Sequence, residues 1–323
     1  MNEDTTRAIE IGLNAVIVSV LGPAPMVLVV GSGAREALPF GPFDPLRHRT
    51  FEIGLRSWVE AQTALNIGHV EQLYTFGDRG RHSQPDDARA HVVSVGYLAL
   101  TRQSPESEEA LTMANANWRP WYGYFPWEDW RDGRPDMLDA FILPALEQWT
   151  TAGGPGPDAR RGQRRKDRLR LSFGGDGSPW DEERVLERYE LLYEAGLLEE
   201  ARRDGRPCVL DTPIALGHPM QFDHRRILAT AISRLRGKLK YRPVVFELMP
   251  PEFTLTELQG TVEAISGRHL HKQNFRRLVE TAELVEPTGA ASTSTGGRPA
   301  ALFRFRREIL RERPAPGLRV GGR

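Results

Sequence analysis

The most informative stretch of this chain is HLHKQNFRRLVETAEL, residues 269–284. At about 100° per residue, a helix over this stretch gathers its apolar side chains into one narrow arc: Phe275, Leu278, Val279 and Ala282. Gln273 and Arg277 then point the opposite way, flanked by Asn274 and Arg276. Arginine, glutamine and asparagine are the side chains that form paired hydrogen bonds to base edges. The pattern therefore predicts a helix with one buried face and one face suited to nucleic acid.

A second helix is predicted immediately before this one. Thr254 and Glu257 match a capping box at its start, and Gly267 fits its end. Its apolar residues recur at helical spacing: Leu255, Leu258, Val262 and Ile265. Two short helices joined by a tight turn with glycine predict a helix-turn-helix. A small helical subdomain without a nucleic-acid partner would also carry amphipathic helices and surface arginines, and this alternative stays open.

Two strands are predicted after the helices, over residues 285–289 and 301–306, with a loop rich in Gly, Ser and Thr between them. This order is that of the wing of a winged helix, and Arg298 in the loop is placed to reach a minor groove. The residues predicted to contact DNA are Thr254, Thr256, His271, Lys272, Gln273, Asn274, Arg276, Arg277 and Arg298.

Charge is distributed unevenly along the chain. The whole sequence is neutral, with 43 Lys and Arg against 43 Asp and Glu. Residues 223–323 contain 19 basic and 10 acidic side chains, a net charge of +9, so the remainder carries −9. A basic end on an acidic body is typical of a DNA-binding domain joined to a domain with another role.

The length of 323 residues suggests two domains and an insertion, with predicted boundaries at 1–130, 131–222 and 223–323. The single cysteine, Cys208, excludes an intrachain disulfide and a zinc site built on several cysteines, and we expect no metal site. No apolar run is long enough to span a bilayer, and no leader with a cleavage site is evident. We expect a cytoplasmic protein with no membrane partner.

The N-terminal region has the pattern of an α/β sandwich. Strands are predicted over residues 9–20, 26–30, 70–76 and 91–100, a Pro/Gly loop over 38–45, and a helix over 50–65.

The middle of the chain is less regular. Four tryptophans, Trp118, Trp121, Trp127 and Trp130, are interpreted as core packing rather than as a stacking platform for bases or sugars. Residues 153–170, rich in Gly and Arg, are predicted to be a solvated loop rather than a phosphate-binding arm. Helices are predicted from Ser178 to about Ala195 and from Asp223 to Leu239. The apolar stripe of the second helix suggests that it links domains or pairs across a dimer axis.

Two parts of the chain resemble a known family. The element order near the N-terminus and the sequence VEQLYTFGD resemble a Nudix domain. The C-terminal sequences YRPVVFELMPPEFTLTELQ, HKQNFRR and GGRPAALFRFR resemble a Nudix-related transcriptional regulator of NAD metabolism. The resemblance covers about residues 8–130 and 223–311, and implies a Nudix-like α/β/α sandwich followed by a winged helix-turn-helix domain.

The Nudix helix of this chain lacks the side chains that the family uses for catalysis. Those enzymes carry an arginine and several glutamates, because Mg²⁺ beside a pyrophosphate needs hard carboxylate ligands. The family pattern is R-E-U-x-E-E-x-G-U, where U is an apolar residue. When the pattern is aligned from the following strand at 70–76, it falls on residues 57–65. The three positions of its glutamates are then occupied by Trp58, Ala61 and Gln62. A shift of one residue recovers only Arg56 and Glu60, which are the candidate ligand-binding residues.

The resemblance therefore implies a regulator rather than an enzyme. We expect a homodimeric repressor of NAD biosynthesis or salvage genes that binds a double-stranded DNA operator and senses a nucleotide sugar such as ADP-ribose, without a cofactor. One alternative is an active Nudix hydrolase of ADP-ribose or a related nucleoside diphosphate derivative. Another is a scaffold whose winged helix binds protein.

Overall fold

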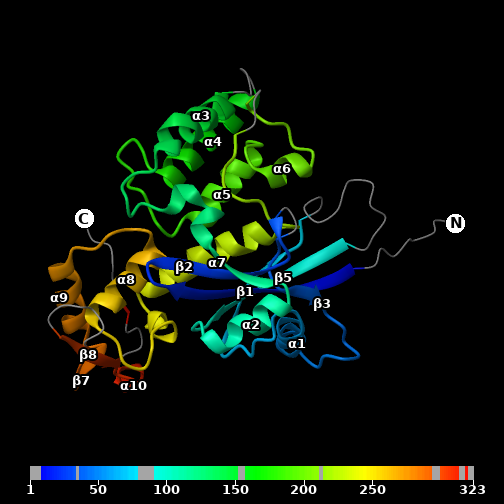
Figure 1. Ribbon diagram of the computed structural model, residues 1–323. Coiled ribbons are helices and arrows are strands. Elements are labelled where there is room, and N and C mark those ends of the chain that lie inside the picture. Colours follow the sequence, from blue (N-terminus) through cyan, green and yellow to red (C-terminus); the bar gives the residue numbers. More distant parts are fainter. Residues whose placement is uncertain are drawn as a thin grey trace.

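A computed structural model describes residues 9–33, 36–78, 91–151, 157–210, 214–292, 299–312 and 317–318 of the chain. A six-stranded sheet forms its centre (Figure 1). The strands are β1 (Ile9–Leu21), β2 (Ala24–Val30), β3 (Phe40–Pro42), β4 (Val70–Phe76), β5 (His91–Leu100) and β6 (Ala116–Pro120). Their order is β4-β5-β1-β2-β6, with β3 also paired to β1, and only the β1–β5 pair is parallel. The predicted hairpin is confirmed as β1–β2, with Val18 opposite Val27.

Strand β1 is buried on both faces. Side chains alternate across a strand, so Leu13 and Ile17 join one hydrophobic cluster while Val16 and Val18 join the other. Helices α1 (Phe51–Thr63) and α2 (Pro105–Met113) lie on the first face, and α7 (His224–Leu239) lies on the second (Figure 1). The predicted α/β/α sandwich is confirmed.

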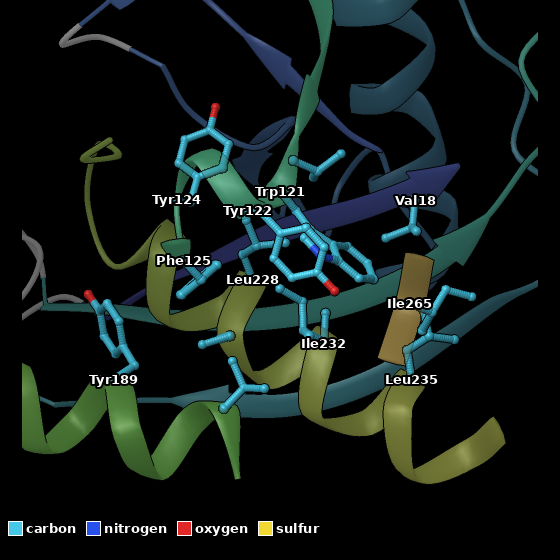
Figure 2. Close-up of a cluster of buried hydrophobic side chains, with 14 of the residues drawn as sticks. Val18, Trp121, Tyr122, Tyr124, Phe125, Tyr189, Leu228, Ile232, Leu235 and Ile265 are labelled. Carbon is cyan, nitrogen blue, oxygen red and sulfur yellow. The ribbon is translucent and has the colours of Figure 1, made fainter. Parts of the chain in front are cut away.

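Helix α7 is buried by its own chain, which corrects the prediction that its apolar stripe pairs across a dimer axis. Ile227, Leu228, Ile232 and Leu235 are all 0–1% exposed. Figure 2 shows Leu228 and Ile232 among aromatic side chains and Leu235 beside Ile265. Gly96 of β5 allows the close approach, because a Cβ there would lie 2.9 Å from Ile227 Cγ2. The helix covers one face of the sheet and also contacts α8, so it connects the sandwich to the C-terminal helices.

Residues 131–222 form a helical layer on the far side of α7 (Figure 1). Its elements are a π-helical turn (Leu138–Ile142), α3 (Leu143–Thr151), α4 (Pro157–Phe173), α5 (Val185–Glu194) and α6 (Glu199–Arg203). Leu146, Leu191 and Leu192 share one hydrophobic cluster with α7. The predicted insertion or linker is therefore part of the main core.

The predicted solvated loop at 153–170 is wrong where the structure describes it, because residues 157–173 form α4. Arginine favours helices, and its long stem packs well on aromatic rings. The Arg165 guanidinium lies 4.0 Å from the Trp149 ring centroid and donates to the Trp149 carbonyl at 2.9 Å.

The next helix begins later than predicted, at Val185 rather than after Ser178, because residues 181–184 form a turn. Its predicted end before Gly196 is confirmed. The interpretation of the tryptophans as core packing is confirmed for Trp121 and Trp127, which are both 0% exposed.

The C-terminal unit contains α8 (Leu255–Ser266), α9 (Lys272–Ala282), β7 (Val285–Ser292) and β8 (Ala300–Phe305). The short helices η5 (Val244–Glu247) and α10 (Ile309–Glu312) flank it. The remaining short helices, η2 (Trp121–Gly123) and η3 (Pro126–Glu128), follow β6. No helix of the described part is long and apolar enough to cross a membrane.

A buried ion triad joins these units. Glu128 of η3 accepts from Arg188 of α5 at 2.6 and 2.8 Å and from Arg236 of α7 at 2.8 Å. All three side chains are 0–1% exposed. Burial alone would raise the pKa of Glu128, but the two guanidinium groups outweigh it and lower that pKa below its ordinary value.

Hydrogen bonds connect this triad to α8. Arg236 also donates to the Ile265 carbonyl at 2.9 Å and to the Tyr122 hydroxyl at 3.2 Å. Tyr122 in turn donates to the Ala264 carbonyl at 2.8 Å. The last turn of α8 is therefore held by side chains from η2 and α7.

We predict that Glu128→Gln lowers the free energy of unfolding by about 3–5 kcal/mol, because it leaves two buried guanidinium groups without a counter-charge. Urea unfolding followed by circular dichroism measures the change. The control is Glu194→Gln, which breaks the exposed 2.7 Å pair with Arg168 and should cost about 0–1 kcal/mol. Equal losses in the two variants would contradict the account.

The lowered pKa of Glu128 also determines how the free energy of unfolding changes with pH. A carboxyl group with a lowered folded-state pKa adds stability that is present above its unfolded value, near 4.5, and is lost as the pH falls through the folded-state pKa. The stability difference between the unmodified chain and Glu128→Gln should therefore shrink in acid.

Candidate nucleic-acid interface

Helix α8 begins and ends as predicted. The Thr254 hydroxyl accepts the Glu257 N–H at 3.2 Å, and the Glu257 carboxylate accepts the Thr254 N–H at 2.7 Å. Gly267 closes the helix with φ +72, in the left-handed region that favours glycine, and a Cβ there would lie 2.5 Å from the Glu128 carbonyl oxygen. Both the capping box and the glycine stop are confirmed.

The turn between α8 and α9 is held by Glu263. Its carboxylate accepts the Leu270 N–H at 2.7 Å and the Gln259 amide at 2.9 Å, and lies 3.3 Å from His269. Burial alone would raise the pKa of Glu263, but these hydrogen bonds lower it below its ordinary value. One carboxylate therefore makes three of the contacts that hold the turn between the two helices.

Helix α9 has the two faces that its sequence predicts. Phe275 and Val279 are 2% and 0% exposed, whereas Leu278 is half-buried. On the other side stand the exposed side chains of His271, Lys272, Gln273, Asn274, Arg276 and Arg277. Within the described part of the chain, none of these six side chains has a hydrogen-bond or ion-pair partner. The face thus offers three cations, two amides and an imidazole to a ligand outside the chain.

The remaining predicted DNA contacts are placed differently. Thr256 is exposed in the first turn of α8. Thr254 is only 4% exposed, and its hydroxyl serves the capping box, so its side chain is not offered to a partner. Arg298 lies outside the described residues.

The wing is confirmed as the β7–β8 hairpin, whose register places Val285 opposite Phe305. Phe253, just before α8, exchanges backbone hydrogen bonds with Phe303 of β8 at 2.9 and 2.8 Å. The Phe246 and Phe305 rings stack with their centroids 4.4 Å apart. The wing, α8 and the preceding segment therefore form one folded unit.

In helix α1, two positions that the Nudix pattern assigns to metal-binding glutamates make structural contacts with β3. The Trp58 indole N–H donates to the Pro42 carbonyl at 2.9 Å. The Gln62 amide accepts the Phe40 N–H at 2.9 Å and donates to the Phe40 carbonyl at 2.8 Å. The Trp58 ring covers Gly41, where a Cβ would lie 2.2 Å from it. Trp58 and Gln62 therefore fasten α1 to β3.

The two candidate ligand residues of α1 are not brought together by a shared contact. Arg56 pairs with Glu52 at 2.8 Å and donates to the carbonyls of Ile67 and Gly68. Glu60 is exposed. Among the residues that the structure describes, no group of three or more His, Cys, Asp or Glu side chains could hold a metal ion.

Sequence reasoning missed the contacts between the central helical layer and the helix-turn-helix. The Trp130 N–H donates to the Gly267 carbonyl at 2.8 Å, and the Arg268 guanidinium donates to the Trp180 carbonyl at 3.2 Å. Backbone carbonyls and isolated arginines give no periodic signal. The cluster of tryptophans was the one visible hint.

Comparison with known proteins gives matches for the C-terminal unit and for the whole fold. Residues 245–305 match the NrtR DNA-binding winged helix domain. A curated relative, the ADPR responsive transcriptional repressor NtrR of Acinetobacter baylyi, is 44% identical over 91 residues, which are 28% of this chain. The chain spans only 36% of that relative's length.

Two solved structures of Shewanella oneidensis NrtR share the fold. The complex with a 27mer DNA matches with a TM-score of 0.51 and 21% identity, over 92% of this chain and 94% of that chain. The structure of the protein alone gives a TM-score of 0.51 at 20% identity, over the same shares. The predicted resemblance is confirmed: the chain carries an NrtR-type winged-helix domain at its C-terminus and has, as a whole, the fold of NrtR.

Proposed function

We propose that this chain is a DNA-binding transcriptional regulator, a repressor of NAD biosynthesis or salvage genes that responds to ADP-ribose or a related nucleotide sugar. The observation that carries the proposal is the exposed face of α9, where Gln273 and Arg277 have no partner within the described residues. Arginine and glutamine recognise base edges through paired hydrogen bonds. In a helix-turn-helix, the second helix enters the major groove.

The charge of the exposed side chains supports this proposal over a protein-binding scaffold. Lys272, Arg276 and Arg277 carry three positive charges on one face of α9, and residues 223–323 as a whole carry +9. Phosphate contacts position such a domain on DNA, and base contacts give it specificity. The winged-helix match and the repressor name of the curated relative point the same way.

The α/β sandwich is proposed to act as a sensor and not as a Nudix hydrolase. Hydrolysis of a pyrophosphate by this family needs Mg²⁺ held by several carboxylates. Two of the positions concerned carry Trp58 and Gln62, which fasten α1 to β3. For a ligand to regulate DNA binding, it must favour one arrangement of the protein over the other. The name of the curated relative suggests ADP-ribose as that ligand.

We predict that Arg277→Ala weakens binding to a selected operator by about 1–3 kcal/mol and changes binding to random DNA little, because it removes a base contact. Lys272→Ala should weaken binding to both DNAs nearly equally and lower the salt slope by about one, because a phosphate contact is lost. Fluorescence anisotropy at two salt concentrations separates the two effects.

The matched control for these variants is Arg164→Ala, an exposed arginine of α4 that should alter neither affinity. An unchanged ratio of operator to random affinity in Arg277→Ala would mean that α9 does not read the base sequence.

We predict that the chain binds ADP-ribose, that binding weakens its affinity for the operator, and that ADP-ribose is not cleaved in the presence of Mg²⁺ or Mn²⁺. Titration calorimetry measures binding, and chromatography of the mixture measures AMP release against a heat-inactivated sample. Turnover above that control would favour the hydrolase alternative. No binding of ADP-ribose at millimolar concentration would refute the proposed effector.

We also propose a homodimer in the cytoplasm, because helix-turn-helix proteins commonly read paired half-sites through a two-fold axis. The stripe of α7 cannot form its interface, since that stripe is buried within the chain. Light scattering at micromolar concentration should give twice the subunit mass of 36.3 kDa. A single subunit mass, with and without operator DNA, would refute the dimer.

A further inference from the structure

The central helical layer contains a cavity of about 830 Å³ between α3, α4 and the loop before α5. This volume falls within the range of ligand sites, roughly 300–1,000 Å³. Its lining residues come in part from α3 and α4. These helices lie apart from α1 and β3, where the Nudix-like helix is found (Figure 1).

One wall of the cavity is aromatic. Trp130 and Trp180 lie with their ring centroids 4.5 Å apart, and Phe173 continues this wall. Leu143 and Leu169 add apolar surface. Such a wall favours a planar ring, because aromatic groups gain from offset or tilted ring contacts as well as from burial of their area.

The same cavity is lined by three cations, Arg134, Lys166 and Arg170. Arg134 pairs with Asp139 at 2.7 Å, and Arg170 lies 3.4 Å from the Ser178 hydroxyl. Lys166 is exposed and has no partner within the described residues. These cations provide a place for phosphate, which binds guanidinium and ammonium groups through charge-assisted hydrogen bonds.

Two carboxylates and the hydroxyls of two threonines also line the cavity. Glu147 and Asp176 would repel a phosphate at close range, but they accept hydrogen bonds from ribose hydroxyls and from the amino groups of bases. The hydroxyls of Thr150 and Thr151 donate to the carbonyls of Glu147 and Gln148 at 2.8 and 2.9 Å, so each remains an acceptor for a ligand. An aromatic wall, cations and acceptors in one cavity match the three parts of a nucleotide: base, phosphate and ribose.

The aromatic wall is connected to the helix-turn-helix. The backbone N–H of Trp130 donates to the carbonyl of Gly267, the residue that ends α8, and the Arg268 guanidinium of the same turn donates to the backbone carbonyl of Trp180. The Arg268 guanidinium also lies 5.9 Å from the centroid of the Trp130 ring. The Arg188 guanidinium lies 3.9 Å from the centroid of the Trp180 ring, and Arg188 pairs with Glu128 of the buried triad. A ligand against the indole rings of Trp130 and Trp180 therefore contacts the two residues whose backbone groups hold the turn before α9.

We propose that this cavity is a second ligand site, for a nucleotide, and that its occupancy is transmitted to the turn between α8 and α9. The site is separate from the proposed ADP-ribose sensor in the α/β sandwich. It gives the central helical layer a regulatory role.

ATP is the probe for the test, because it carries a base, a ribose and a strong negative charge. Titration of the full chain with ATP should show binding at one site. Lys166→Glu should raise the dissociation constant for ATP about tenfold or more, because an attractive charge becomes a repulsive one. The control is Arg164→Glu on the same helix, an exposed residue that does not line the cavity and should change the constant little.

Hydrogen exchange measured by mass spectrometry tests the link to the turn, and it needs no DNA. ATP should slow amide exchange in peptides covering residues 128–134 and 265–272, and this effect should be lost in Lys166→Glu. Binding of ADP-ribose should survive Lys166→Glu, which separates this site from the sensor.

Three results would overturn the proposal: no ATP binding at millimolar concentration, equal losses in Lys166→Glu and Arg164→Glu, or loss of ADP-ribose binding together with ATP binding in Lys166→Glu. ATP binding without any change in exchange at residues 265–272 would overturn the transmission.

Discussion

The architecture depends on one buried carboxylate. Glu128 holds Arg188 of the helical layer and Arg236 of α7, and Arg236 holds the end of α8. Each guanidinium would be costly to bury alone, and each gains its counter-charge from the same two oxygens. The sandwich and the helical layer therefore cannot shift independently without breaking a buried ion pair, and the helix-turn-helix cannot shift without breaking the hydrogen bond from Arg236 to Ile265. This constraint gives a ligand in one unit a physical route to the DNA-binding face.

The proposed function rests on two surfaces, helix α1 of the sandwich and the exposed face of α9. In α1, Trp58 and Gln62 stand where the Nudix pattern has metal-binding glutamates, and both contact β3. In α9, charge and amide groups remain exposed and unpaired within the described residues, and the buried pair of Phe275 and Val279 holds them in place. The proposed regulator needs both surfaces, because it must bind its ligand without cleaving it and must also bind DNA.

The parts that could be predicted from sequence are those with a local or periodic signal. The capping box at Thr254, the stop at Gly267 and the two faces of α9 follow from spacing alone, as do the hairpin and the buried strands. The predictions that were wrong concern features that depend on tertiary contacts. The helix α4 could not be separated from a charged loop, because its arginines find Trp149 and Glu194 only after folding. The stripe of α7 has the same pattern whether it covers a sheet or a dimer partner. The triad was invisible, since Glu128, Arg188 and Arg236 are far apart in sequence and ordinary in composition.

The central claim is that α9 reads the sequence of double-stranded DNA. The most direct measurement is to incubate the purified chain with sheared genomic DNA, recover the bound fragments and sequence them, with and without ADP-ribose. The account predicts enrichment of a recurring site made of two related halves about one helical turn apart, or a multiple of it, with less recovery when ADP-ribose is present. Fragments that match the input in sequence, at every salt concentration at which binding occurs, would contradict it.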